Sequence, residues 1–218
     1  MSRKRVGILI SGRGSNMAAL IKAAEDPAYP AEIAIVLSDN PGARGLGLAA
    51  AAGIPAKPID RKAFADKASF EAALDVALLE AGVELICLAG FMRLLSSAFV
   101  ERWHDRVLNV HPSILPAFKG INTHQRVLDA GVRLHGCTIH FVRAAVDDGP
   151  IIAQATVPIL AGDTADTLSD RLLTAEHKAY PMALRLVASG RARVVGDRVA
   201  IDDEPAQPEA PLIVPWIP

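Results

Sequence analysis

The stretch Val6-Gly7-Ile8-Leu9-Ile10-Ser11-Gly12-Arg13-Gly14-Ser15-Asn16 joins a continuous apolar run to a glycine-rich turn, and a helical pattern follows over 17–25. A strand, such a turn and a helix build a phosphate-binding loop, because glycines allow close backbone approach and the helix N-terminus presents unpaired N–H groups to an anion. The third glycine of the dinucleotide-binding pattern and the GK[ST] of triphosphate sites are both missing. The stretch therefore indicates a mononucleotide phosphate site or, as the alternative, a helix that Ser15 and Asn16 only cap.

Outward from this unit, apolar runs alternate with helical patterns along most of the chain. Such alternation predicts an α/β fold with three layers, a Rossmann-like, mostly parallel sheet with helices on both faces. Two later runs are separated only by 143–150, which predicts a hairpin and a mixed or antiparallel C-terminal part of the sheet. The expected strands are 6–10, 33–37, 56–59, 85–89, 107–110, 137–142 and 151–157, and the expected helices are 17–25, 43–52, 69–81, 97–103, 125–130 and 166–189.

The last helical pattern, 166–189, contains Pro181, which should kink or interrupt it. A small hairpin is expected over 194–200. We find no internal repeat and no linker, so residues 1–201 are expected to form a single domain, followed by a tail over 202–218. Prolines and acidic residues dominate the start of this tail, which should be mobile unless Trp216 docks on the body.

Composition and charge limit the function. The chain has 218 residues and a formal net charge of −1, so it lacks the positive field typical of nucleic-acid-binding proteins. Its apolar runs are too short for a signal peptide or a membrane span. Cys87 and Cys137 lie in apolar runs, which predicts buried thiols, a reducing compartment and a cytoplasmic protein. No H-E-x-x-H, C-x-x-C or EF-hand pattern is present, so no metal is expected.

A second informative stretch runs from Leu108 to Gly120, as Leu-Asn-Val-His-Pro-Ser-Ile-Leu-Pro-Ala-Phe-Lys-Gly. Residues two apart on a strand point to the same face, so Asn109 and His111 converge on one small volume. The two prolines that follow end the strand in a stiff loop. Ligands of open α/β sheets bind beyond the carboxyl ends of the strands, where this pair is expected. The alternative is a turn-capping asparagine beside a hydrogen-bonded loop histidine.

The string Asn-Val-His-Pro-Ser-Ile-Leu-Pro, with Gly120 and Thr123-His124 after it, resembles the signature of the folate-dependent formyltransferases. The resemblance spans residues 6 to 181. Its other motifs are Gly14-Ser15-Asn16, Leu88-Ala89-Gly90-Phe91-Met92-Arg93, His140-Phe141-Val142, Asp147-Asp148-Gly149-Pro150 and Glu176-His177. It implies transfer of a formyl group from 10-formyltetrahydrofolate to the amine of glycinamide ribonucleotide, a step of de novo purine biosynthesis that needs no metal.

The resemblance also implies the catalytic residues, which are Asn109, His111 and Asp147. Asn109 and a protonated His111 would donate hydrogen bonds to the oxyanion of the tetrahedral species, each contributing roughly 3 kcal/mol. Asp147 would favour the imidazolium and accept the amine proton, directly or through a water molecule. Its position in an apolar strand makes His140 a supporting residue: a hydrogen-bonded core histidine near the site that would hold Asn109 or His111 in place. Without the resemblance, Asp147 would be an ordinary turn-forming residue.

The binding residues are implied in the same way. The ribonucleotide would contact Gly14, Ser15, Asn16 and Glu176. The C-terminal half would hold the folate, whose binding residues are Lys67, Met92, Arg93, Leu94, Leu95, Asn109, Arg143, Ala144, Ala145, Val146 and Asp147. Two positions depart from the pattern: Leu173 replaces a polar residue that some relatives have near the phosphate, and Asn122 stands where some relatives have histidine.

Several alternatives stay open. A formyltetrahydrofolate deformylase, with water as acceptor, shares the catalytic residues, as does methionyl-tRNA formyltransferase, which has an additional C-terminal domain. A non-enzymatic folate- or mononucleotide-binding module is also compatible with the fold. The phosphate loop favours the phosphorylated amine. The chain is expected to be a monomer or homodimer. The remaining histidines, His104, His124, His135 and His177, are expected to be structural.

Overall fold

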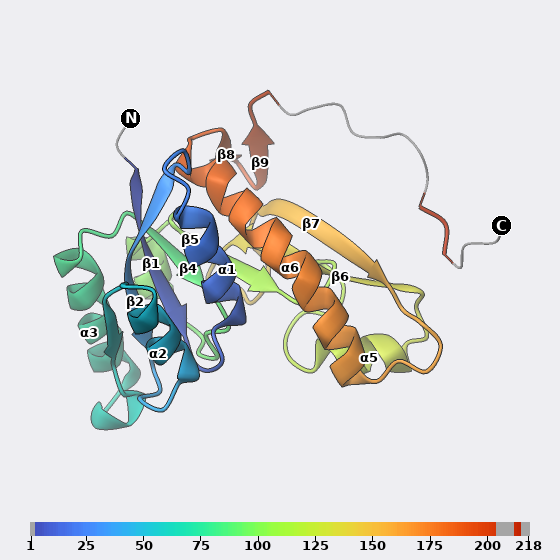
Figure 1. Ribbon diagram of the computed structural model, residues 1–218, viewed down its shortest axis with the longest axis horizontal. Coiled ribbons are helices and arrows are strands. Elements are labelled where there is room, and N and C mark those ends of the chain that lie inside the picture. Colours follow the sequence, from blue (N-terminus) through green and yellow to red (C-terminus); the bar gives the residue numbers. More distant parts are fainter. Residues whose placement is uncertain (1–2, 204–211, 215–218) are drawn as a thin grey trace.

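The computed structural model describes residues 3–203 and 212–214 (Figure 1). Its strands are β1 (Lys4–Ile10), β2 (Ala31–Ser38), β3 (Ala56–Pro58), β4 (Leu85–Leu88), β5 (Val107–His111), β6 (Leu134–Phe141), β7 (Ile151–Pro158), β8 (Ala192–Val195) and β9 (Arg198–Ile201). Its helices are α1 (Ser15–Ala24), α2 (Arg44–Ala51), α3 (Lys67–Glu80), α4 (Ser97–Arg102), α5 (Thr123–Asp129) and α6 (Ala165–Ala188), with a 3-10 turn, η1 (Arg61–Ala63). Every predicted element is present, with ends shifted by a few residues.

The main sheet has the order β3-β2-β1-β4-β5-β6-β7. Strands β1 to β5 pair in parallel, and the winding reverses between β1 and β4. In open α/β sheets this reversal opens a crevice at the carboxyl ends of the two strands, where ligands bind. The glycine-rich turn after β1 and the 89–96 loop after β4 therefore meet at this edge.

The predicted hairpin is confirmed. Strand β6 runs antiparallel to β5 and β7 runs antiparallel to β6, so the sheet becomes mixed at this side. The register pairs Asn109 with His140 and His111 with Thr138, which brings two histidine-bearing strands together. Strands β8 and β9 form the predicted small C-terminal hairpin.

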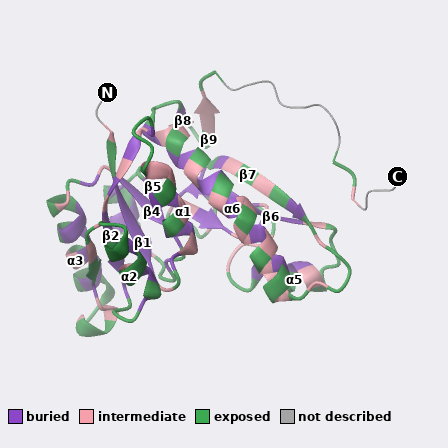
Figure 2. Cartoon of the chain, in the orientation of Figure 1, coloured by how far each residue is buried: buried purple, intermediate pink, exposed green. Residues whose placement is uncertain are grey.

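Helices cover the two faces of the sheet over separate cores, as expected for three layers. One core lies under α1 and α6 and includes Met17, Leu168 and Val110. The other lies under α3 and α4 and includes Phe70 and Phe99. Figure 2 shows buried central strands and helices whose buried residues recur along one side. Cys87 and Cys137 are buried, as predicted, and burial raises the pKa of each thiol to about 12.

The structure lacks the interruption that was one expected outcome at Pro181: α6 is continuous from Ala165 to Ala188. Proline in a helix interior costs about 3 kcal/mol, and packing at this point offsets that cost. The Tyr180 hydroxyl is fully buried and lies 3.1 Å from the carbonyl oxygens of both Leu88 and Leu108. The Tyr29 hydroxyl donates to the Pro181 carbonyl at 2.6 Å. Tertiary contacts thus hold α6 across the ends of β4 and β5.

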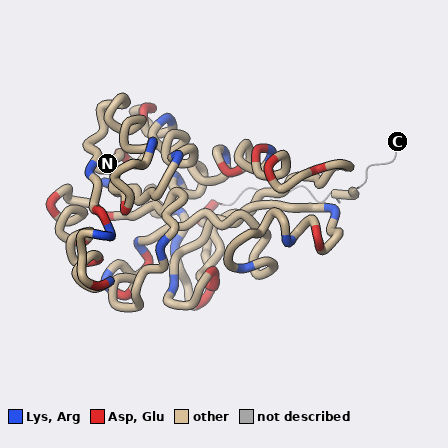
Figure 3. Tube along the Cα trace, turned by 90° about the horizontal axis from the view of Figure 1, so that it is seen from below, with Lys and Arg blue, Asp and Glu red and all other residues tan. Residues whose placement is uncertain are grey.

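Among the described residues, no helix has the length and apolar character needed to cross a lipid bilayer. Basic and acidic side chains are interspersed along the described chain (Figure 3), in keeping with the net charge of −1. Most of the tail, including Trp216, lies outside the described residues, so the prediction for it is not tested. Leu212 and Ile213 are described and exposed.

Candidate active site

Strand β5 carries Asn109 and His111 to the edge of the sheet. Because β5 extends one residue beyond its predicted end, His111 is still held by pairing with Thr138. His111 is 5% exposed, and Asn109 is partly buried. The two side chains point to the same face of the strand, opposite to Val110, as their spacing predicts.

His140 holds the amide of Asn109. The His140 Nδ1 lies 2.9 Å from the carbonyl oxygen of Phe141, which can only accept, so Nδ1 carries the proton. Burial lowers the pKa of His140, which keeps the ring neutral and leaves a lone pair on Nε2. The Asn109 Nδ2 donates to this lone pair at 3.2 Å. Of the roles suggested for His140, the structure supports orienting Asn109, whose second N–H then stays available.

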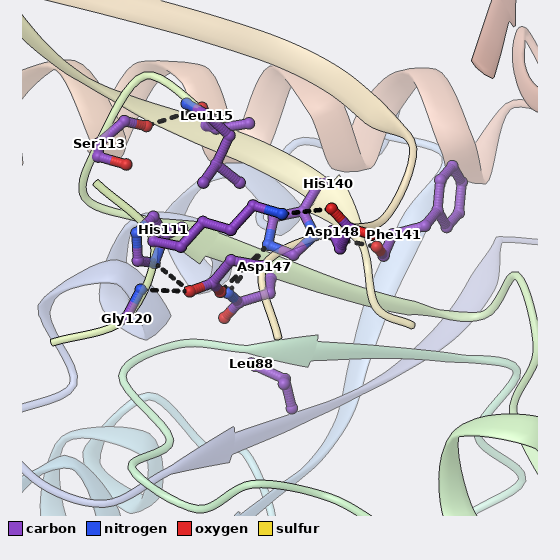
Figure 4. Close-up of polar contacts among 12 residues, drawn as sticks. Leu88, His111, Ser113, Leu115, Gly120, His140, Phe141, Asp147 and Asp148 are labelled. Carbon is purple, nitrogen blue, oxygen red and sulfur yellow. Dashed lines mark hydrogen bonds and ion pairs between the residues drawn. The ribbon is translucent and has the colours of Figure 1, made fainter. Parts of the chain in front are cut away.

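Asp147 reaches the histidines from the 142–150 loop (Figure 4). Its Oδ2 lies 3.3 Å from His111 Nδ1 and accepts from the Gly120 N–H at 2.9 Å, while Oδ1 lies 3.9 Å from His140 Nε2. Asp147 has φ +50°, a left-handed conformation that aspartate tolerates better than most residues. A Cβ on Gly149 would lie 1.7 Å from the Phe141 carbonyl oxygen, so only glycine lets the loop fold this tightly against β6.

The 112–122 loop closes over the other side of His111. The carbonyl oxygen of Phe118 lies 3.1 Å from His111 Nε2, so both ring nitrogens of His111 face oxygen acceptors. Only the doubly protonated ring donates to both. Phe118 has φ +55°, which is strained for a bulky residue. Lys119 forms an ion pair with Asp148, next to the Gly120–Asp147 hydrogen bond, and so ties the two loops together.

A cavity of about 400 Å³ lies on the other side of β5, at the N-terminus of α1. Its lining residues are Ser11, Gly12, Arg13, Gly14, Ser15, Asn16, Ala89, Gly90, Met92, Val110, Pro112, His124, Ser169, Leu173 and Glu176. Val110 and Pro112 flank His111 in the chain, so the cavity borders the catalytic candidates without being lined by them. A more open groove between β3 and α3 contains none of the predicted site residues.

The N-terminus of α1 faces this cavity without a side-chain cap, so the capping alternative is wrong. Gly14 takes the N-cap position with φ +77°, a left-handed conformation that favours glycine. A Cβ there would lie 3.0 Å from Gly45 Cα, and the Gly45 N–H donates to the Gly12 carbonyl at 3.0 Å. The turn is thus packed tightly on α2, and its N–H groups are free of side-chain acceptors.

Asn16 and Glu176 meet in the cavity wall although they are 160 residues apart in the chain. The Asn16 Nδ2 donates to Glu176 Oε2 at 2.6 Å, and both residues are buried. Asn16 Oδ1 is buried and has no hydrogen-bond partner among the described residues. Burial raises the pKa of the Glu176 carboxyl, although the hydrogen bond from Asn16 opposes this. The predicted ribonucleotide residues therefore lie together and include an unsatisfied acceptor.

The predicted folate residues are spread more widely. Met92 lines the cavity, and its N–H donates to the Ser11 hydroxyl at 2.8 Å. Arg93 Nε lies 2.6 Å from the buried Asp39 carboxylate, which anchors the 89–96 loop to the end of β2. Met92 and Leu94 have exposed side chains, as does Val146 in the second loop, whereas Leu95 is partly buried and packs against the core under α3 and α4.

Two predicted folate side chains are engaged elsewhere. Arg143 pairs with Asp105, which lies just before β5. Lys67 begins α3 and lies 4.0 Å from Glu71, whose carboxylate accepts from Ser96 at the end of the 89–96 loop. Ala144 and Ala145 are exposed in the 142–150 loop.

Sequence reasoning missed part of the cavity wall. His124, expected to be structural, lines the cavity, and its Nδ1 lies 3.0 Å from His135 Nε2. Burial lowers the pKa of both rings, and that of His135 falls to about 4. The signal available for His124 was its place at the start of α5, directly after the string that carries the resemblance. Arg13 and Ser169 also line the cavity, whereas His177 Nε2 is buried without a partner among the described residues.

The departure at Leu173 is part of the cavity wall, whereas Asn122 is exposed and does not line it. Among residues 3–203 and 212–214, no cluster of three histidine, cysteine or acidic side chains is arranged to hold a metal ion.

Comparison with known proteins adds independent observations. A family model described as formyl transferase matches residues 4–184. A phosphoribosylglycinamide formyltransferase from Haemophilus influenzae is 38% identical over 207 residues, which cover 95% of this chain and 97% of that protein. A trifunctional purine biosynthetic protein adenosine-3 from Gallus gallus is 52% identical over 193 residues, 88% of this chain. The chain spans only 19% of that longer relative.

Solved structures are similar over nearly the whole chain. A glycinamide ribonucleotide transformylase 1 from Symbiobacterium toebii has a TM-score of 0.90 and 45% identity, covering 92% of this chain and 95% of that one. A formyltetrahydrofolate deformylase from Pseudomonas syringae pv. tomato has a TM-score of 0.84 but only 25% identity, covering 93% of this chain and 67% of that one.

Proposed function

The chain belongs to the formyl transferase family, and from this premise we propose that it transfers the formyl group of 10-formyltetrahydrofolate to the amine of glycinamide ribonucleotide. The products are N-formylglycinamide ribonucleotide and tetrahydrofolate, in purine biosynthesis. The observation that carries the proposal is the meeting of Asn109, His111 and Asp147 beside a cavity built on the N-terminus of α1. One part supplies acyl-transfer chemistry and the other an anion site.

In this reaction the ribonucleotide occupies the cavity. Its phosphate accepts hydrogen bonds from the N–H groups of Gly14, Ser15 and Asn16 at the uncapped start of α1. The glycinamide part contacts Glu176, and a donor on the substrate satisfies the unpartnered Asn16 Oδ1. Val110 and Pro112 line the cavity and are the chain neighbours of His111. The cavity therefore ends close to His111, and the amine meets the formyl carbon at the end of β5.

The folate binds next to this cavity, against the 89–96 and 142–150 loops. The exposed apolar side chains of Met92, Leu94 and Val146 suit its aromatic rings, and main-chain groups of both loops suit the donors and acceptors of the pteridine. Lys67 serves the glutamate tail only if its weak contact with Glu71 gives way. Arg143 contributes through its backbone, because Asp105 holds its side chain.

The chemical step begins with the neutral amine. An α-amino group has a pKa of roughly 7.7–8.0, so a useful fraction is unprotonated near neutral pH and attacks the formyl carbon without a strong base. The carbon–nitrogen bond forms as the carbonyl electrons move to oxygen. The free N–H of Asn109 and an N–H of His111 donate to this oxyanion. For His111 the oxyanion replaces Asp147 or the Phe118 carbonyl as acceptor.

The proton then leaves the attacking nitrogen. Asp147 accepts it, directly or through a water molecule, because its carboxylate already faces the site and is fixed by the Gly120 N–H. Return of a proton to N10 of the folate breaks the old carbon–nitrogen bond and releases tetrahydrofolate. No step requires a metal. A single domain over 1–201, the oligomeric state and the cytoplasmic location stay predictions.

The test is a rate measurement that follows the absorbance of the deformylated folate with and without glycinamide ribonucleotide. A rate that depends on the ribonucleotide, with formylated product in equal amount, supports the transferase. An undiminished rate without it means that water is the acceptor and that the chain is a deformylase. Absence of turnover in both cases contradicts both readings and leaves a binding module.

A further inference from the structure

The cavity beside α1 contains three ionisable side chains among its lining residues: Arg13, His124 and Glu176. A phosphate monoester carries one to two negative charges at neutral pH, so a positive side chain strengthens its binding beyond what N–H dipoles supply. Glu176 is acidic and cannot supply a positive charge. His124 faces His135 at 3.0 Å and is only partly exposed, and burial lowers the pKa of both, so this pair is uncharged near neutral pH. Leu173 adds an apolar surface to the wall.

The Arg13 guanidinium is free of competing partners in the part of the chain that the structure describes. Within residues 3–203 and 212–214, Arg13 forms neither an ion pair nor a side-chain hydrogen bond. By contrast, Arg93, Arg143 and Arg171 each pair with an aspartate. Arg13 is exposed at the mouth of the cavity. Its five N–H donors are therefore available to a ligand, and their planar fork matches phosphate oxygens.

The backbone beneath Arg13 is fixed. The Gly12 carbonyl accepts from Gly45, and Gly14 packs on the Cα of that residue. The next helix starts without a cap, and Asn16, which is 8% exposed, has a buried oxygen without a partner. Unsatisfied polar groups in a wall are costly, and a bound ligand relieves that cost. Free backbone donors and an arginine without a partner among the described residues thus meet at this cavity, and Asn16 in its wall has a buried oxygen without a partner among those residues.

We propose that Arg13 is the cation that binds the substrate phosphate and thereby makes this chain select a phosphorylated amine over an unphosphorylated one. This inference rests on the proposed function, because it names the residue that recognises the charged end of that substrate. Arg13 acts in binding and not in the chemical step, since its place at the turn after β1 is on the far side of β5 from Asn109 and His111. The chain has a net charge of −1, and Figure 3 shows basic and acidic residues interspersed along it, so the attraction is local.

Arg44 provides a matched control. It is an exposed arginine without an ion pair among the described residues, and it precedes Gly45, the residue that contacts the Gly12–Gly14 turn. It does not line the cavity. Removing Arg44 therefore changes the net charge near the turn by the same amount as removing Arg13, without touching the proposed contact.

The experiment measures binding of ribose 5-phosphate by calorimetry, together with KM for glycinamide ribonucleotide. Arg13→Ala should weaken both by about tenfold, the loss of a charge-assisted bidentate contact, with kcat changed less than about twofold. Arg13→Lys keeps the charge and loses the fork, so about a threefold loss is expected. Arg44→Ala should change either value by less than about twofold. Raising the salt concentration should weaken wild-type binding more than Arg13→Ala binding.

Equal effects of Arg13→Ala and Arg44→Ala overturn the proposal, because a general field would then explain binding. Wild-type protein that binds ribose 5-phosphate no better than ribose overturns it as well, whether or not formyl transfer occurs. Normal phosphate binding through Arg13 without formyl transfer contradicts the proposed function alone. Melting temperatures of the variants guard against misfolding, and Arg13→Lys decides the question if Arg13→Ala does not fold.

Discussion

The two sides of the proposed site differ in how well the protein satisfies its own polar groups. In the cluster of Asn109, His111, His140 and Asp147, the groups that were assigned catalytic roles have protein partners at 2.9–3.3 Å. In the cavity, the start of α1 is uncapped, Asn16 Oδ1 is buried without a partner, and Arg13 has no ion pair among the described residues.

This difference is the one expected if the cluster carries out the chemical step and the cavity binds the substrate. Groups that stabilise a transition state are effective when they are already oriented, because no reorganisation is then needed during the reaction. Groups that bind a ligand must be free to receive it, so their unsatisfied state in the ligand-free protein is expected. Mutations in the cluster should therefore change kcat, and mutations in the cavity should change KM.

The largest effect is expected for Asp147→Asn, which should lower kcat by about 10³-fold. Asparagine tolerates φ +50° and still accepts from Gly120, but it neither takes up a proton nor pairs with an imidazolium. Steady-state kinetics and thermal unfolding check this together. The control is Asp148→Asn, an exposed neighbour paired with Lys119, for which kcat should change less than about twofold. A similar loss in both variants would assign Asp147 a role in holding the loop.

His111→Ala should lower kcat by about 10²-fold, the value of one oxyanion donor, with KM for the ribonucleotide nearly unchanged. His104→Ala, at a half-exposed histidine next to Asp105, is the control and should leave kcat unchanged. A His111→Ala variant that mainly raises KM would contradict the division of roles between the cluster and the cavity. An unfolding midpoint far below that of the wild type would instead make His111 structural.

On the cavity side, Ser15→Ala keeps the backbone N–H but removes the hydroxyl, a second donor that this cavity-lining residue offers to the phosphate. It should therefore raise KM for the ribonucleotide about fivefold, as expected for the loss of one hydrogen bond of about 1 kcal/mol. KM for 10-formyltetrahydrofolate and kcat should stay within about twofold of the wild-type values. Ser189→Ala, at the C-terminal end of α6, serves as the control. An unchanged KM for the ribonucleotide removes Ser15 from the phosphate site.

The smallest effect on catalysis, below about twofold at pH 7.5, is expected for His135→Gln, whose main consequence is for stability. Burial lowers the pKa of His135 to about 4, whereas the unfolded chain takes up this proton near pH 6.5. The contribution of the neutral, buried His135 to the free energy of unfolding is therefore fully present above pH 6.5 and is lost as the pH falls towards 4. Urea unfolding at several pH values measures the slope, which should be shallower in His135→Gln. Equal slopes contradict the assignment.

Local patterns predicted most of the fold. Every expected strand and helix is present, because alternating apolar runs and glycine-rich turns act over a few residues. The continuity of α6 through Pro181, where an interruption was one of two expected outcomes, has a tertiary cause. The Tyr29 hydroxyl donates to the Pro181 carbonyl from far away in the chain, and Tyr180, the residue before Pro181, contacts the distant Leu88 carbonyl. No local sequence rule includes such long-range contacts.

For the site, the convergence of Asn109 and His111 follows from strand periodicity alone. The resemblance named Asp147 and Glu176, but only the structure shows that Asp147 contacts His111 and that Glu176 contacts Asn16. The place of His124 in the cavity wall was missed. Its position next to the resembling string was a signal, but only the tertiary structure shows which segments lie opposite it.

The sequence by itself determined the α/β class, the glycine-rich turn after β1 and the placing of an amide and an imidazole at the end of β5, because each depends on patterns within or between neighbouring elements. Only the tertiary structure decided which polar groups are satisfied. Three features depend on segments far apart in the chain. They are the His140 lone pair that accepts from Asn109, the tight packing of Gly149 on Phe141 that brings Asp147 to the site, and the free donors around Arg13. Hydrogen bonds and charges act over a few ångströms in space, whatever the distance along the sequence.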